Sequence, residues 1–249
     1  TELITEETMN TAVEYDSFNI VKWLHYNRAE GCTEFAMDIA GNNGNFEILE
    51  FLHNNRDEGC SSNSIIYAAE NDKLNIIKWF HKNRINDISK HCYKIAIENA
   101  VRNSNYDILV YLYEKYIERF NKKSFYPNIY FSDNIMKIAA VAGNLEIVKW
   151  LHTKVKMYSN TELNLAAKFG HIELVKWLYE NRYYNIMSKI DDMQILDEPI
   201  GIGDNKMRAI IYAAESGNME IIIYLTEMEK NIDIKILQET VNAAAKNGY

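Results

Sequence analysis

The sequence lacks the features of a membrane-spanning or nucleic-acid-binding protein. No apolar run approaches the roughly 18 residues of a membrane-spanning helix. Basic residues are not in excess, since 35 Asp and Glu outnumber 27 Lys and Arg and give a net charge of −8. A nucleic-acid or anionic-membrane surface needs a basic stripe. We therefore expect no nucleic-acid partner and no membrane partner.

Motifs for catalysis and cofactor binding are also missing. The chain has no phosphate-cradling glycine loop, no H-E-x-x-H, no G-x-S-x-G and no C-x-x-C. We therefore expect no enzyme activity, no catalytic residues, no cofactor and no bound metal. Only two prolines occur, Pro127 and Pro199, and both lie between the repeated segments described next.

The chain is instead built from a repeated pattern. Residues 143–152 read G-N-L-E-I-V-K-W-L-H, and close copies recur from one end to the other. We take the position of Trp150 as the anchor column, whose members are separated by 28, 28, 32, 39, 27 and 47 residues. The anchors are Trp23, Phe51, Trp79, Tyr111, Trp150, Trp177 and Tyr224. A period of this size indicates a repeat array.

Two further columns define the repeat unit. The alanine column, eleven residues before the anchor, holds Ala12, Ala40, Ala68, Ala100, Ala139, Ala166 and Ala213. The turn column, seven before it, holds Asp16, Gly44, Asp72, Ser104, Gly143, Gly170 and Gly217. Apolar residues three and four apart predict a helix over about 145–153, preceded by another helix. Glycine between them predicts a left-handed cap, which should cost the two aspartates and the serine roughly 1 kcal/mol each. Alanine predicts a close helix contact.

Stacking of these helix pairs predicts one all-α solenoid over residues 1–249, because a single pair cannot bury its apolar face. It has seven repeats and a truncated eighth, which restarts the pattern at residues 244–248. Insertions fall at about 115–132 and 183–207. The first, rich in aromatic and basic residues, is an extended second helix or a binding surface. The second is functional or disordered, and Pro199, Gly201 and Gly203 should break any helix there.

The pattern A-A-x-x-G-N-x-E-I-V-x-x-L, present from Ala139 and closely matched from Ala166, resembles the ankyrin repeat. The opening T-E-L-N-L-A-A at Thr161 is similar to the T-P-L-H-x-A-A of that family. The short units ending K-W-L-H resemble ankyrin proteins of giant amoeba-infecting viruses. The resemblance implies an α-solenoid that binds a partner protein, with the projecting fingers of the family reduced to short loops.

The three cysteines occupy equivalent positions, eight residues before the alanine of the following unit. Stacked units place such positions about 10 Å apart, beyond the roughly 7 Å limit for a disulfide. We therefore expect Cys32, Cys60 and Cys92 to be free thiols in a reducing compartment, the cytoplasm or the nucleus. For a viral protein this is the host cytoplasm.

Histidines and glutamates also recur in columns. His25, His53, His81 and His152 lie two residues after the anchor. They are too far apart to share a zinc ion, so we interpret them as last-turn residues favoured by the helix dipole and by free carbonyl groups. The carboxylates of Glu47, Glu146, Glu173 and Glu220 should complement the dipole in the first turn of the second helix.

Candidate partner-binding residues lie on the first helix of each unit, thirteen and nine residues before the anchor. We call these the first and second inner columns. By resemblance to ankyrin proteins this helix lines the concave side on which partners dock; simple solvation of a polar face is the alternative. The pairs are Asn10 and Glu14, Asp38 and Asn42, Ile66 and Glu70, Glu98 and Arg102, Lys137 and Val141, Asn164 and Lys168, and Ile211 and Glu215.

The leading hypothesis is a non-catalytic protein-interaction module, whose inner helix face and two insertions select a protein partner of unknown identity. The alternative is the targeting or scaffold half of a longer protein, such as a ubiquitin-ligase substrate adaptor with its activity outside this chain. Enzyme activity is a third hypothesis, which no constellation of residues supports. We expect a monomer.

Overall fold

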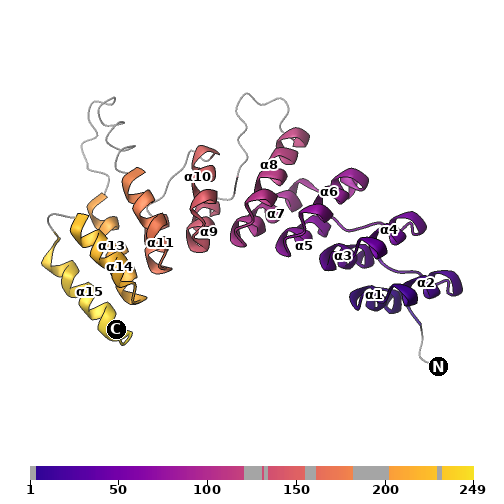
Figure 1. Cartoon of the computed structure of the whole chain (residues 1–249), viewed down its shortest axis with the longest axis horizontal. Coiled ribbons are helices and arrows are strands. Elements are labelled where there is room, and N and C mark those ends of the chain that lie inside the picture. The colour runs from indigo at the N-terminus through magenta and orange to yellow at the C-terminus, as the bar shows by residue number, and fades with distance from the viewer. Residues whose placement is uncertain (1–3, 121–130, 132–133, 155–160, 182–201, 229–231) are drawn as a thin grey trace. The chain divides into compact units, whose positions relative to one another are not determined.

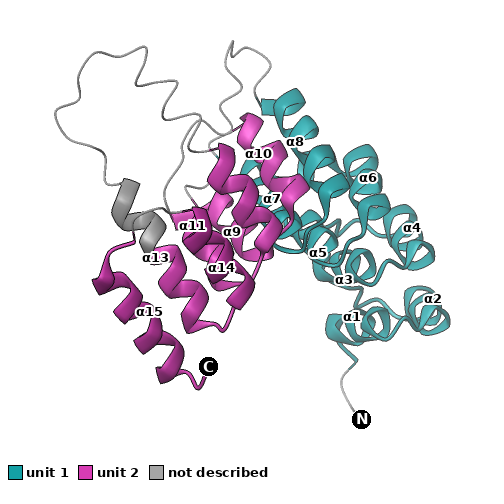
Figure 2. Cartoon of the chain, turned by 60° about the vertical axis from the view of Figure 1, so that its left-hand side comes forward, with its two compact units in different colours: residues 1–132 teal, residues 133–249 magenta. Residues whose placement is uncertain are grey.

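The computed structural model describes residues 4–120, 131, 134–154, 161–181, 202–228 and 232–249, with backbone alone for 202–207. Every regular element in these ranges is a helix (Figure 1), as the all-α prediction requires. Two compact units divide the chain after residue 132 (Figure 2), and each is described by itself.

Unit 1 comprises four helix pairs. Their bounds are α1 (Glu6–Glu14), α2 (Phe18–Asn27), α3 (Glu34–Asn43), α4 (Phe46–Asn55), α5 (Ser64–Glu70), α6 (Leu74–Asn83), the short 3-10 helix η1 (Ile85–Asp87), α7 (Lys90–Arg102) and α8 (Tyr106–Phe120).

Unit 2 continues the pattern. Its helices are α9 (Ile135–Ala142), α10 (Leu145–Lys154), α11 (Thr161–Lys168), a helix over residues 172–181, α13 (Ile202–Glu215), α14 (Met219–Met228) and α15 (Ile234–Lys246). The anchors lie on the second helix of each pair, as the periodicity predicts.

The turn column adopts the predicted left-handed conformation. Its four glycines have φ between 71° and 79°, and Asp16, Asp72 and Ser104 have φ of 51°, 56° and 60°. These three are the non-glycine residues with positive φ in the described part of the chain. An asparagine that follows the turn can then cap the second helix, as where Asn144 Oδ1 accepts a hydrogen bond from the Ile147 amide at 3.1 Å. The left-handed residue and the capping asparagine therefore fix where the first helix ends and the second begins.

The alanine column lies in the core. All seven alanines are buried, six of them fully. Successive first helices pack together, as α3 does with α1 and α5. A small side chain at this position lets the helices approach closely, as the column predicts.

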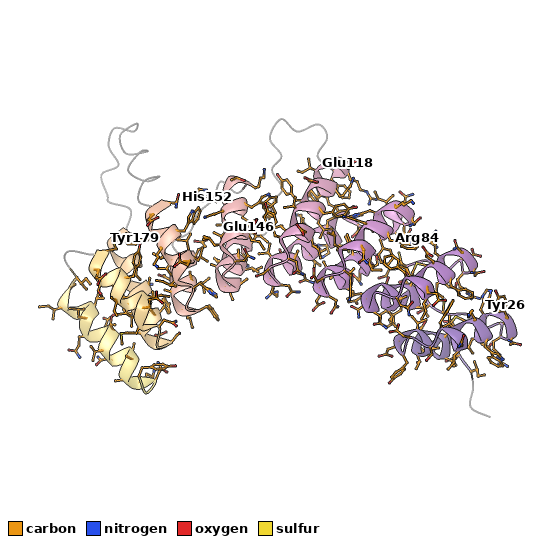
Figure 3. All side chains as sticks on the ribbon, viewed as in Figure 1. Tyr26, Arg84, Glu118, Glu146, His152 and Tyr179 are labelled. Atoms are coloured by element: carbon orange, nitrogen blue, oxygen red, sulfur yellow. The ribbon has the colours of Figure 1, made fainter. Side chains whose placement is uncertain are left out.

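The position two residues after the anchor forms a ladder of rings between neighbouring repeats; we call it the ring column. Five of its rings pack against the anchor ring of the next repeat, edge-on in four of the five pairs, whereas a sixth, Tyr113, stacks on Phe131. His152 and Tyr179, both labelled in Figure 3, belong to it. The ring-centroid distances are 5.3 Å for His25 with Phe51, 5.0 Å for His53 with Trp79, 5.3 Å for His81 with Tyr111, 5.1 Å for His152 with Trp177 and 6.0 Å for Tyr179 with Tyr224.

This ladder gives the histidines a second role beside the one interpreted from the sequence. Burial and then the Arg84 charge lower the pKa of His53. Burial, followed by the charges of Lys115 and Arg119, lowers the pKa of His81 to about 4. The lowered pKa values reduce what these two rings gain from the negative end of the helix dipole, although both lie in the last turn of their helices, as interpreted. Their second role is aromatic packing between repeats.

In the first insertion, α8 continues to Phe120, and its Tyr116 is buried against Tyr93 with ring centroids 6.1 Å apart. The extended helix is therefore present over residues 115–120, while 121–130 lie outside the described residues.

In the second insertion, residues 182–201 lie outside the described residues, and with them Pro199 and Gly201. The prediction that Gly203 breaks any helix is wrong, because α13 begins at Ile202. A single glycine costs a helix only about 1 kcal/mol relative to alanine, so it weakens a helix without ending it.

Candidate functional site

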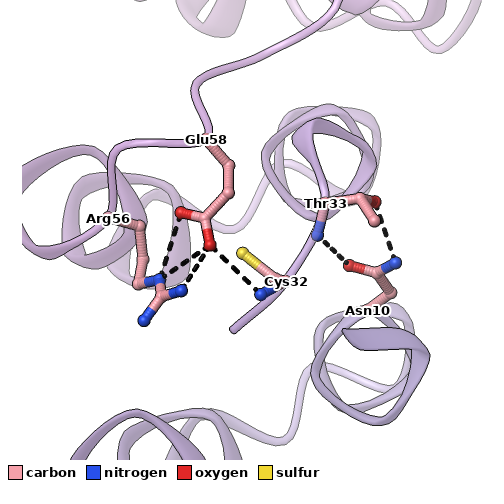
Figure 4. A network of polar contacts seen from close by, with 5 residues as sticks. All are labelled: Asn10, Cys32, Thr33, Arg56 and Glu58. Atoms are coloured by element: carbon pink, nitrogen blue, oxygen red, sulfur yellow. Dashed lines mark hydrogen bonds and ion pairs between the residues drawn. The ribbon is translucent and has the colours of Figure 1, made fainter. Parts of the chain in front are cut away.

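The loops that connect successive repeats in unit 1 are tied to each other by polar contacts (Figure 4). Glu58 accepts hydrogen bonds from Arg56 Nε at 3.1 and 3.2 Å, and from the Cys32 amide of the preceding loop at 3.2 Å. Burial opposes ionisation of Glu58, yet the Arg56 bond and two backbone amides lower its pKa to about 2. A fixed carboxylate thus joins two consecutive loops.

Asn10 makes the second contact in Figure 4. Its Oδ1 accepts from the Thr33 amide at 3.2 Å, and its Nδ2 donates to Thr33 Oγ1 at 2.9 Å. One repeat further, Asp38 replaces the asparagine and Ser61 replaces the threonine. Asp38 Oδ1 accepts a hydrogen bond from the Ser61 amide at 3.0 Å, and its Oδ2 accepts one from the Ser61 hydroxyl. These members of the first inner column hold the next repeat in register.

Asp38 lies almost wholly out of solvent, with 1% of its surface exposed. Burial raises its pKa to about 7, although the two Ser61 bonds act in the opposite direction. A protonated carboxyl group can donate to the Ser61 hydroxyl as the Asn10 amide donates to Thr33. The neutral form therefore reproduces the hydrogen bonding of the neighbouring repeat.

A recess of about 540 Å³ opens beside these contacts. Carboxylates outnumber basic groups in its lining, where Arg84 lies 3.8 Å from Asp87. This surplus of negative charge favours positively charged groups of a partner over negative ones. The lining residues are Glu34, Asp57, Glu58, Gly59, Cys60, Ser61, Ser62, Asn63, Arg84 and Asp87.

The two inner columns have different environments. In the first, Asn10, Asp38, Ile66 and Asn164 are buried, and Glu98, Lys137 and Ile211 are half-buried. The expectation of an exposed face is wrong for the buried members, because they are covered by neighbouring parts of the stack. Partner binding by the candidate residues stays a prediction.

The second inner column is the accessible one. Asn42 and Glu215 are half-buried, and the remaining members project into solvent. The exposed members are Glu14, Glu70 and Arg102 in unit 1, and Val141 and Lys168 in unit 2. A varied set of side chains therefore reaches the surface of the first helices, one turn away from the first inner column.

The pairing between repeats was not predicted, although a signal was present in the sequence. Asn10 and Asp38 are each followed, 23 positions later, by a hydroxyl residue, Thr33 or Ser61, in the segment before the next first helix. A polar residue with a matched hydroxyl one repeat away indicates a contact between repeats. Solvation of an exposed face requires no such match.

The cysteines are free thiols, as predicted, and all three are buried. Burial, with nearby carboxylates, raises the pKa of Cys32 to about 11 and that of Cys60 to about 12. Both thiols therefore stay protonated near neutral pH, and the thiolate is the reactive form of cysteine.

The part of the chain that the structure describes contains neither a metal site nor a membrane span. There, no three His, Cys, Asp or Glu side chains form a group that could hold a metal ion. None of the helices described is long and apolar enough to cross a membrane.

Comparison with known families gives two matches. A model of ankyrin repeats (3 copies) matches residues 99–190, and a model of ankyrin repeats (many copies) matches residues 163–226. Together they extend over residues 99–226, just over half of the chain. No curated protein matches the chain.

Proposed function

The chain is built from ankyrin repeats, and on that premise we propose that it binds a partner protein through the exposed side chains of its first helices. Ankyrin repeats are in general protein-interaction modules. The observation that supports this surface is the contrast between the two inner columns. The first inner column is largely enclosed within the stack. The second inner column is largely exposed, and its side chains differ from one repeat to the next.

The character of this surface changes along the chain. In unit 1, Glu14 and Glu70 are acidic and Arg102 is basic, and the recess at the loop of residues 57–63 carries further carboxylates. In unit 2, Val141 and Lys168 offer an apolar and a basic group. Interfaces use charge complementarity mainly for specificity and association rate. The acidic recess favours a basic segment of the partner.

Charge reversal with matched controls tests the proposal. Proteins from a cell extract are captured on the wild-type chain, on Glu70→Lys and on Lys168→Glu. The controls are Glu50→Lys and Lys149→Glu, which reverse exposed charges on the second helices α4 and α10. A protein captured by wild type and controls, then lost with either inner variant, supports the proposal once direct binding is shown with purified partner. Equal capture by every variant contradicts it.

The proposal also includes a viral origin and a location in the host cytoplasm. The K-W-L-H units, which resemble those of giant-virus ankyrin proteins, and the free thiols support a protein that acts on a host partner in the cytoplasm. The adaptor role is the second candidate, and it requires a ubiquitin-ligase subunit among the captured proteins. Direct binding assays with such a subunit, before and after Lys168→Glu, separate an adaptor contact from binding of a substrate.

A further inference from the structure

In unit 1 the residue directly before the turn column is an asparagine in the second, third and fourth repeats. Each of these side-chain amides donates a hydrogen bond to the first helix of the preceding repeat, so the three asparagines link the ends of neighbouring helices. The contacts are Asn43 Nδ2 to the Glu14 carbonyl oxygen at 3.1 Å, Asn71 Nδ2 to Asn42 Oδ1 at 2.6 Å, and Asn103 Nδ2 to the Glu70 carbonyl oxygen at 2.7 Å.

The Asn43 amide has further acceptors around it. Its Nδ2 also lies 3.4 Å from the Val13 carbonyl oxygen and 3.3 Å from Asp16 Oδ1. Asn45 Nδ2 donates to the same Asp16 oxygen at 3.2 Å. Because the oxygens that face Asn43 carry negative charge or partial negative charge, this position suits a donor and would repel a carboxylate.

The three asparagines differ in the residue that follows them. Asn43 is followed by Gly44, whereas Asp72 and Ser104 follow the other two. All three following residues have the left-handed conformation, with φ of 79°, 56° and 60°. What distinguishes Asn43 is therefore the lack of a side chain on the next residue, since the backbone turn is shared.

An asparagine followed by glycine loses its side-chain amide more readily than other asparagines, because no Cβ hinders the backbone nitrogen that attacks it. The Gly44 nitrogen forms a bond to Asn43 Cγ. The bond from Cγ to Nδ2 breaks, and ammonia leaves with the proton of the attacking nitrogen, so that a cyclic imide joins the two residues. Water then adds to one imide carbonyl, and the ring opens to aspartate or isoaspartate at this position.

The folded chain slows this reaction without preventing it. The Gly44 amide donates to the Gly41 carbonyl oxygen at 3.1 Å, and the Asn43 amide is held by the first repeat. Both hydrogen bonds have to break before the imide forms, so the reaction requires a local opening of this contact. Asn43 is half-buried, so part of its surface is in contact with water.

We propose that Asn43 is a deamidation site, at which an opening of the contact between the first two repeats becomes permanent. The product places a carboxylate among two carbonyl oxygens and the Asp16 carboxylate, where the amide had donated, so the contact cannot re-form as before. This inference goes beyond the proposed function and does not rest on it.

The test is incubation of the full chain in warm, mildly alkaline buffer, followed by proteolysis and mass spectrometry. Asn247 also precedes a glycine, and its amide bonds within its own helix, so the incubation continues until Asn247 has reacted. Amide loss should then be found at Asn43. It should be at least tenfold slower at Asn71 and Asn103, which have similar contacts but no following glycine.

Exchange of the following residue gives matched variants. Gly44→Ser reproduces the turn at Ser104 and should slow the reaction at Asn43 at least tenfold. Ser104→Gly should create a new reactive site at Asn103. An unchanged rate in either variant, or reaction at Asn247 without reaction at Asn43, overturns the proposal.

The effect on the repeat contact is measured with Asn43→Asp, which has the charge of the product. Amide hydrogen exchange in α1 should be at least tenfold faster than in wild type. The control is Asn42→Asp, which adds the same charge one residue earlier, where the neighbouring group is the Asn71 donor, and it should leave α1 unchanged. Wild-type exchange in Asn43→Asp, or equal acceleration in both variants, contradicts the proposed loss of the contact.

Discussion

Arg84 Nε donates a hydrogen bond to His53 Nδ1 at 3.0 Å, which joins the loop after α6 to the helix α4 of the preceding repeat. The bond uses the lone pair of Nδ1 and so favours the tautomer with its proton on Nε2. The pKa of His53 is lowered, first by burial and second by the positive charge of Arg84. The ring of His53 also packs on Trp79.

His53→Ala removes both contacts and should lower the free energy of unfolding by about 1–2 kcal/mol, from the lost ring packing and hydrogen bond. Urea unfolding followed by tryptophan fluorescence measures the change. Asn54→Ala, at the adjacent exposed position, is the control and should stay within about 0.5 kcal/mol of wild type. Equal stability of the two variants would show that the ring column contributes nothing.

Two buried groups should act oppositely on stability between about pH 6.5 and pH 4. His81 has a folded pKa of about 4 against an ordinary value of 6.5, so in this range the unfolded chain binds a proton that the folded chain does not. Its contribution is present above pH 6.5 and falls by up to about 3 kcal/mol on acidification. Asp38 has a folded pKa of about 7 against 3.8, so the folded chain holds the extra proton. Its contribution rises by up to about 4 kcal/mol on acidification.

Single variants separate these contributions. Relative to wild type, Asp38→Asn should lose stability as the pH falls from 7 to 4, because of these two effects only that of His81 remains. Asn10 shows that an amide makes the same bonds at this position. His81→Phe should gain stability relative to wild type over the same range. Urea unfolding at several pH values measures both slopes, and parallel pH profiles for the three proteins would refute the assignment.

Glycine in the turn column should stabilise the chain where the left-handed residue is not glycine. Asp72→Gly removes the conformational penalty at φ of 56° and should raise the free energy of unfolding by up to about 1 kcal/mol. Gly143→Ala, at φ of 76°, should have the opposite effect, and its new methyl group would also meet the His171 ring. Thermal unfolding measures both changes. A loss of stability in Asp72→Gly would mean that the aspartate side chain contributes more than the backbone strain costs.

The alanine column predicts a steric limit in the core. Ala139→Leu should destabilise by about 1–3 kcal/mol, because Ala139 is fully buried where helices approach closely. Val141→Leu enlarges an exposed side chain of the same helix and serves as the control. Thermal unfolding of both variants decides the matter, and a neutral Ala139→Leu would remove the alanine column from the helix contact.

Local backbone chemistry explains why much of the fold could be predicted. The turn column requires a left-handed residue, and Gly143 and Asp72 both satisfy it, so the sequence indicates each helix pair directly. The alanine column similarly indicates that neighbouring helices approach closely at this position. Both are constraints on one position, which a repeated sequence makes visible.

The candidate site depends on pairs of residues from different repeats, which is why its prediction was less complete. Asp38 looks like an exposed helix residue until Ser61 is placed beside it. His81 looks suited to a helix end, and nothing near it in the sequence indicates that its ring stacks on that of Tyr93, 5.3 Å away. The exposure of each side chain follows from these long-range contacts rather than from helical periodicity.

The ring ladder also makes the tryptophans differ in their accessibility to a fluorescence quencher. The indole of Trp23 precedes the first rung and is 54% exposed, whereas Trp79 and Trp177 are half-buried, each with a histidine ring of the preceding repeat against it. An aqueous quencher such as iodide will therefore reach Trp23 in preference to those two. The fluorescence that iodide quenches first comes from Trp23 and reports on α2. Local unfolding of α2 can therefore be followed in the unlabelled protein.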